Sequence, residues 1–73
     1  MSRAAVIGEA VRTGGFALAG AVVITAEDAR QARAAWGALP ADVAVLVLTA
    51  SAAAWLGDVP QTRPGLLIAV MQA

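Results

Sequence analysis

The sequence predicts an α/β fold with a small four-stranded parallel sheet in the order 2-1-3-4, flanked by helices. Four short apolar runs are the expected strands: Arg3–Ile7, Ala21–Ile24, Val43–Leu48 and Leu66–Val70. The third run is continuous and rich in β-branched residues, which is typical of a strand covered on both faces. The segments between the runs have helical character, and this strand–helix–strand alternation indicates a parallel sheet joined by right-handed crossovers. We therefore expect the first and third strands to be central.

The first crossover is short, because only Glu9–Gly20 separates the first two strands. This length is close to the minimum of about a dozen residues for a parallel connection. The sequence therefore predicts a brief helix over Gly14–Ala19, with Gly20 at its C-terminal end, where a positive φ favours glycine.

The second crossover carries the strongest helical pattern, over Ala26–Leu39. Thr25 is the expected N-cap, with Asp28 three residues later. The acidic first turn suits the helix dipole, and Pro40 disfavours a helical Leu39. One face at helical spacing is apolar, and its members are Ala29, Ala32, Trp36 and Leu39.

A third, shorter helix is expected over Ser51–Leu56, ended by Gly57. The stretch Asp58–Gly65 contains two prolines and a terminal glycine, and we expect it to be a loop. Trp55 is either a core residue or an anchor for a partner, and burial in the core is favoured because it stabilises a small domain strongly.

Composition limits the function classes. The 73 residues form one domain, 60% hydrophobic, with five arginines, five acids and no Lys, Cys or His. Disulfides, thiolate chemistry and the commonest metal ligand are thereby excluded, and a net charge of zero argues against nucleic-acid binding. A chain of this size is often helped by a partner. The longest uncharged stretches are shorter than the roughly 20 residues of a membrane span, so we expect a cytoplasmic protein.

The glycines near the N-terminus invite comparison with phosphate-binding loops. A P-loop needs a Lys, which the chain lacks, and Gly8-Glu9-Ala10 has no second glycine for a dinucleotide fingerprint. We expect no phosphate or cofactor site. Instead, Gly8 is expected to turn the chain off the first strand, and Gly15 to let the short helix start close to the sheet.

Catalytic and metal sites are not expected either. A receiver-type phosphorylation site needs paired acids and a Lys, whereas Glu9 stands alone and Thr49 ends the third strand. Ser2 and Ser51 have no His to activate them. The acids Glu9, Asp42 and Asp58 are interpreted as loop or cap residues, with Glu9 and Asp42 at opposite ends of the sheet.

Two blocks, Ile7-Gly8-Glu9 and Gly15-Phe16-Ala17-Leu18-Ala19-Gly20, resemble the N-terminal pattern of the F-subunit family of V-type and A-type rotary ATPases, which reads IGD and then GFRLAG. Their spacing matches without a gap. The resemblance continues at Leu46–Thr49 and at Arg63–Ile68, so it extends over the whole chain.

This resemblance implies a non-catalytic component of the central stalk that docks on the coiled-coil shaft, the D-subunit of the rotary ATPase, within a heteromeric complex. Such a component supports the coupling of ATP hydrolysis or synthesis to ion transport, for example of protons. We expect the docking surface to include Phe16, Trp55 and Arg63. The chain departs from the pattern at Ala17, where the family has Arg, and at Ala50, where it usually has an acid. It also ends at Ala73, before the C-terminal segment through which family members contact the shaft or regulate hydrolysis, so we expect docking by the globular domain alone.

Two other interpretations stay open. In the first, the chain is a free-standing flavodoxin-like module that binds a small ligand or another protein. In the second, it is a degenerate receiver-like domain that serves as an interaction platform. Co-purification with ATPase components would favour the stalk function, and a bound small molecule would favour the ligand-binding module.

Overall fold

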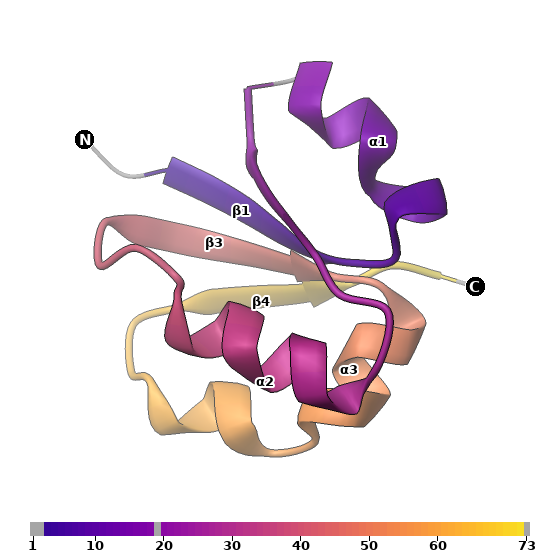
Figure 1. Ribbon diagram of the computed structural model, residues 1–73. Coiled ribbons are helices and arrows are strands. Elements are labelled where there is room, and N and C mark those ends of the chain that lie inside the picture. Colours follow the sequence, from indigo (N-terminus) through magenta and orange to yellow (C-terminus); the bar gives the residue numbers. More distant parts are fainter. Residues whose placement is uncertain (1–2, 19, 73) are drawn as a thin grey trace.

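The computed structural model describes residues 3–18 and 20–72, and of residues 16–18 it describes the backbone alone. Strands and helices alternate along the chain (Figure 1). In order they are β1 (Arg3–Gly8), α1 (Ala10–Leu18), β2 (Val22–Thr25), α2 (Ala29–Gly37), β3 (Val43–Leu48), α3 (Ala50–Leu56), the 3-10 helix η1 (Val59–Thr62) and β4 (Leu67–Val70).

The four strands form one sheet in the order β2-β1-β3-β4, and all three pairs are parallel. The predicted fold class and strand order are therefore confirmed. One row of paired residues runs straight across the sheet: Val22, Ala5, Leu46 and Ile68. Because neighbours in register point to the same side, such rows assign the strand residues to one face or the other, except at the register shift between Arg3 and Ala4.

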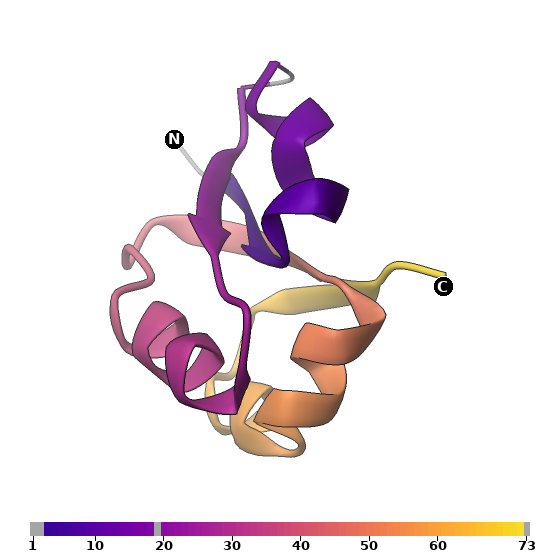
Figure 2. The same cartoon turned by 45° about the vertical axis from the view of Figure 1, so that its right-hand side comes forward.

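The helices cover the two faces of the sheet unequally. Helix α1 lies on one face, and α2 and α3 lie on the other (Figures 1 and 2). The main core fills the space between the sheet and α2 and α3. Its strand members are Ala5, Ile7, Val43, Leu46 and Leu48, and its helix members are Ala32, Ala35, Ala52 and Leu56. The alanines let both helices lie close to the sheet, where they pack on the larger side chains of Ile7, Leu46 and Leu48.

Helix α1 differs from the prediction because it begins at Ala10 rather than Gly14. The carboxylate of Glu27 accepts a hydrogen bond from the Ala10 N–H at 2.9 Å, which supports the early start. Gly14 and Gly15 consequently lie inside the helix, and a Cβ at either would meet no atom within 4 Å. The expectation that Gly15 allows close approach to the sheet is therefore wrong. Gly20 has the predicted positive φ, 86°.

Helix α2 is shorter than the predicted Ala26–Leu39. Asp28, with φ −155° and ψ 176°, is the N-cap in place of Thr25, and its side chain accepts from the Gln31 N–H at 2.7 Å. The Gln31 side chain in turn accepts from the Glu27 N–H at 2.9 Å. This reciprocal pair resembles a capping box, which Asp with Gln forms better than Thr with Asp. The helix ends at Gly37, two residues before Leu39 and the following Pro40.

The third crossover agrees closely with prediction. Helix α3 begins one residue before Ser51, because Thr49 caps it by accepting from the Ala52 N–H at 3.2 Å. Gly57 ends it with a φ of 55°. The expected loop Asp58–Gly65 contains the short helix η1, which has Pro60 in its first turn.

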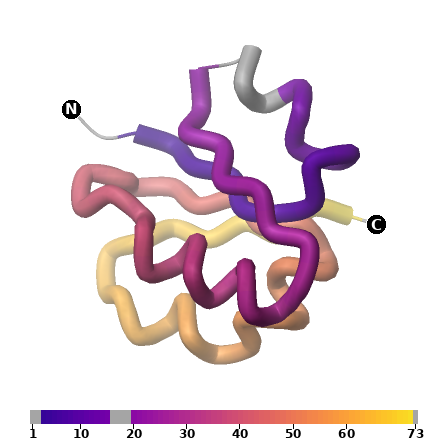
Figure 3. The backbone as a smooth tube through the Cα atoms, viewed as in Figure 1, coloured from indigo at the N-terminus to yellow at the C-terminus, as the bar shows by residue number. Residues whose placement is uncertain are grey.

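The described chain enters the sheet at the amino ends of the strands and leaves it at their carboxyl ends, which we call the amino edge and the carboxyl edge. Because all strands are parallel, the start of β1 and the end of β4 lie at opposite ends of the strands (Figure 3). No helix within the described residues has the length and apolarity needed to cross a membrane.

Candidate functional site

The carboxyl ends of β1 and β3 are the place where an α/β sheet of this order holds a ligand. The crossovers leave these neighbouring strands in opposite directions, β1 toward β2 and β3 toward β4, which opens a crevice between their ends. A hollow of about 90 Å³ lies there. Its walls are Glu9, Arg12, Ala50, Ser51, Met71 and Gln72.

Glu9 and Thr49 connect the two strand ends directly. The hydroxyl of the fully buried Thr49 donates to Glu9 Oε1 and also caps α3. The hydrogen bond from Thr49 is the main reason that the pKa of Glu9 lies below its usual range, with smaller contributions from Ser51 and the nearby Arg12. Glu9 is therefore ionised at neutral pH and is a weak proton acceptor.

Gly8 explains how Thr49 reaches this position. A Cβ at Gly8 would collide first with Cγ2 of Thr49 and would lie 2.6 Å from its Oγ1, so only glycine leaves room for the Thr49 side chain. The first glycine of the N-terminal pattern thus serves a side-chain contact between the ends of β1 and β3.

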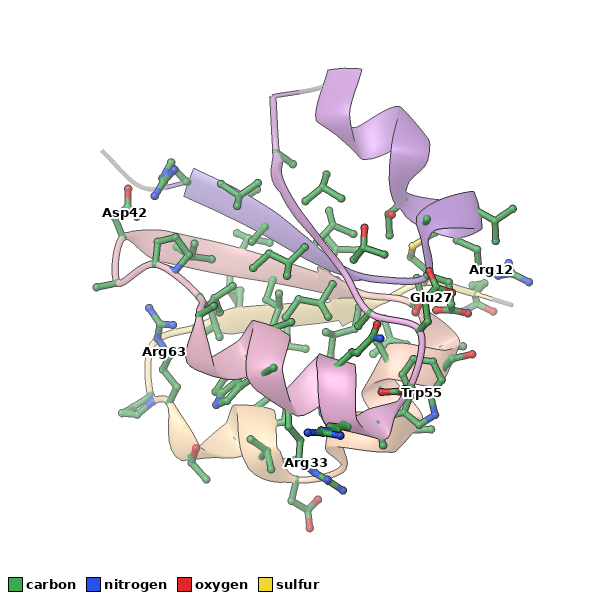
Figure 4. All side chains as sticks on the ribbon, viewed as in Figure 1. Arg12, Glu27, Arg33, Asp42, Trp55 and Arg63 are labelled. Atoms are coloured by element: carbon green, nitrogen blue, oxygen red, sulfur yellow. The ribbon has the colours of Figure 1, made fainter. Side chains whose placement is uncertain are left out.

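The other two acids of this edge are also engaged in capping. Glu27 holds the first N–H of α1, and Asp28 holds the first turn of α2. Figure 4 shows Glu27 and Arg12 close to the end of β1 at the carboxyl edge. Each carboxylate that follows β1 or β2 therefore accepts a hydrogen bond from the loops or helices around it.

The chemistry that these groups support is limited. Within the described residues, no three acidic, His or Cys side chains gather as a metal site. The hollow is also well below the several hundred Å³ typical of pockets that enclose a small-molecule ligand. A shallow hollow of about 290 Å³ lies between α2 and the edge strand β2, and three alanines of α2 and its C-cap, together with Ile24, Thr25 and Gln31, line it.

At the opposite, amino edge, two arginines donate hydrogen bonds to the loop between α2 and β3. Arg3 donates to both carboxylate oxygens of Asp42, at 2.7 and 2.8 Å, which lowers the pKa of Asp42. Arg63 donates to the carbonyls of Pro40 and Ala41, both at 3.1 Å. Glu9 and Asp42 therefore lie at opposite ends of the sheet, as predicted, and both arginines fasten the loop between α2 and β3.

The structure places the side chains of two of the three residues predicted for the docking surface, Trp55 and Arg63. The side chain of Phe16 lies outside the described residues, although its backbone belongs to α1. Trp55, on α3, packs against the core on the other face of the sheet. Arg63 is far from Trp55, toward the amino edge (Figure 4).

The structure exposes a different apolar surface. In the row facing α1, Val6 is fully buried, its neighbour Val47 is half-buried, and Ala69 beyond it is exposed. Among the described residues, no helix lies over β3 and β4 on this side (Figures 1 and 2). We call this surface the open half-face; its residues are Val45, Val47, Leu67, Ala69 and Met71.

The sequence pattern did not reveal the open half-face, although the crossover rule could have. Right-handed connections place the helix between β1 and β2 on one face and the other two helices on the opposite face. That argument leaves β3 and β4 uncovered beside α1.

In comparisons with known proteins, no family model, no curated protein and no solved structure matches this chain significantly.

Proposed function

We propose that this chain is a non-catalytic component of the central stalk of a V-type or A-type rotary ATPase, and that it docks on the coiled-coil shaft. It would lie on the cytoplasmic side of the membrane and support the coupling of ATP turnover to ion transport. The observation that carries the proposal is the pair of blocks Ile7-Gly8-Glu9 and Gly15–Gly20, at the spacing found in the F-subunit family.

The positions of these blocks agree with a structural role. Gly8 and Glu9 join the end of β1 to Thr49, and Gly20 makes the turn into β2 with a positive φ. The second block lies on α1 and the turn that follows it. The blocks thus belong to the connection between β1 and β2.

A second observation that supports the proposed function is that the acidic side chains at the carboxyl edge are engaged in hydrogen bonds within the chain. Glu9, Glu27 and Asp28 accept hydrogen bonds that hold the N-terminal ends of helices or their caps. These contacts use the polar groups of this edge for stability, which suits a module that acts by binding another protein.

The departures from the family pattern fall on helices. Ala50, where an acid is usual, is the first residue of α3 and is exposed; Ala17 belongs to α1. A partner contact made by these family side chains would be missing here, so the remaining apolar surface would contribute more to docking.

The direct test is reconstitution with the shaft. The chain and the shaft protein of the same organism are co-expressed, and the mixture is separated by size-exclusion chromatography. We expect a stable one-to-one complex that also joins the catalytic head. Separate elution of the two proteins at micromolar concentration would contradict the proposal.

The main alternative is a flavodoxin-like module that binds a small ligand at the carboxyl edge. The specific observation in its favour is the hollow between Glu9, Arg12 and Ser51 at the switch point of the sheet. Native mass spectrometry of the purified chain distinguishes the two functions, because the alternative requires a retained small molecule and the stalk function does not.

A further inference from the structure

We propose that an α-helix of a partner chain packs on the open half-face, beside α1 and across β3 and β4. The identity of the partner as the shaft rests on the function proposed above. The choice of the open half-face as the docking surface rests on the geometry of this sheet.

The first argument is the contrast within one sheet face. A parallel sheet is normally covered on both sides, and on the side of α1 Val6 has no exposed surface, while its β2 neighbour Val23 is partly buried. Across β3 and β4 the same face is covered by no helix of the described residues, and Leu67 is 70% exposed. The next layer on this side therefore ends halfway across the sheet.

The second argument is size. Strands lie about 4.8 Å apart, so β3 and β4 together offer a strip about 10 Å wide. A helix with its side chains is about 10–12 Å in diameter. One helix parallel to α1 fits this strip and restores the second layer.

The third argument is chemistry. The open half-face contains no charged residue along β3 or β4. At its carboxyl end, Met71 adjoins the hollow formed with Glu9, Arg12, Ser51 and Gln72. A matching helix would be apolar along most of one face and polar where it passes this hollow.

Pairing through the edge of the sheet explains the surface less well. A strand added to β4, from a peptide or from a second copy, would bond to the backbone of Leu67–Val70. It would leave Val45 and Val47 uncovered, because they lie on the sheet face away from that edge. A helix across β3 and β4 covers these residues.

Two aspartate substitutions in one strand test the proposal. Leu67 points to the open half-face, whereas Val70, which is 52% exposed, points to the side of α2 and α3. With the purified shaft protein as the probe, we expect Leu67→Asp to weaken binding about tenfold or more, as at other central apolar contacts. Val70→Asp is the matched control and should change binding less than about twofold.

Each outcome has a distinct meaning. If the unchanged chain does not bind the shaft protein, the proposed function fails and this partner fails with it. If it binds and Leu67→Asp binds equally well, the open half-face is not the docking surface, although the function stands. If the two variants weaken binding equally, an edge contact replaces the proposed helix. A dimer of the unmixed chain in analytical ultracentrifugation, disrupted by either aspartate, would identify a second copy as the occupant.

A second measurement does not depend on introducing a charge. Because the chain has no Cys, Ala69→Cys places a single thiol on the open half-face, and Gln61→Cys places one on η1. Thiol modification at position 69 should slow when the shaft protein is added, while the rate at position 61 stays the same. Equal rates at position 69 with and without the bound shaft would overturn the proposal.

Discussion

The two halves of the sheet face that carries α1 have similar side chains but different surroundings. Val6, on β1, is fully buried beneath α1, whereas Leu67, on β4, is 70% exposed. Both belong to apolar runs of the same parallel sheet. An apolar strand sequence therefore specifies the sheet, while the path of the crossovers determines which part of its face is covered.

The difference in burial predicts which substitutions affect the stability of the fold and which affect binding to a partner. The covered half and the core below it contain the fully buried residues, including Ile7 and Leu46. The open half-face is supported from below by Leu48 and Leu46 but is in contact with solvent above. Substitutions in the covered half should therefore affect folding, and those in the open half-face should mainly affect association.

The largest expected effect comes from placing the same charge in both halves. Val6→Asp buries a carboxylate without a partner and should lower the free energy of unfolding by about 4 kcal/mol, enough to unfold much of a domain of this size. Leu67→Asp should lower it by about 1 kcal/mol or less. Urea unfolding followed by tryptophan fluorescence measures both, because Trp36 and Trp55 pack against the core. Equal losses would show that the open half-face is covered in solution.

The next effect concerns the tight end of β1. Gly8→Ala places a methyl group against Thr49, which must shift away from Glu9, and we expect a loss of about 1–3 kcal/mol. The matched control is Gly14→Ala on α1, where the new methyl group meets open space. It should raise stability by about 0.5–1 kcal/mol, because alanine is the better helix former. Thermal unfolding monitored by circular dichroism distinguishes these opposite signs.

A smaller effect is expected where α1 is attached. Glu27→Ala removes the acceptor for the Ala10 N–H and should cost about 0.5–1 kcal/mol. Amide hydrogen exchange should become faster in α1 and stay unchanged in β3 and α3. Uniformly faster exchange would mean that the two halves of the sheet open together rather than separately.

The smallest effect is a pH dependence at the amino edge, where Arg3 of β1 meets Asp42 before β3. Because the pKa of Asp42 is lowered in the folded chain, mainly by the hydrogen bond from Arg3, the stabilisation is present at neutral pH. It disappears as the pH falls below the ordinary aspartate range near 4. Asp42→Asn should thus be slightly less stable at pH 7 and indistinguishable from the unchanged chain at pH 2. A constant difference across this range would exclude the ion pair as the cause.

Much of the fold follows from local patterns that the sequence displays. Val43–Leu48 is continuous and β-branched, and it forms a strand with those bounds. Gly20 and Gly57 end their helices at positive φ, as short-range geometry requires. The difference at α2 has a local cause as well, because Asp28 and Gln31 form a cap that Thr25 does not.

The start of α1 was harder to predict. Its first N–H is bound by Glu27, which lies 17 residues later in the chain. Two glycines in the middle of the segment favoured a shorter helix, and their helical cost is offset by a contact that appears only after β2 pairs with β1. The contact between Thr49 and Glu9, 40 residues apart, was unpredictable for the same reason.

By itself, the sequence determined the four strands, their order, the three connecting helices and the neutral, Cys-free chemistry of the chain. These properties depend on side-chain periodicity and on turns of a few residues. Only the tertiary structure decided that Glu27 binds the first N–H of α1, that Thr49 donates to Glu9, and that Trp55 and Arg63 lie far apart. Such features depend on which distant segments the sheet register and crossovers bring together.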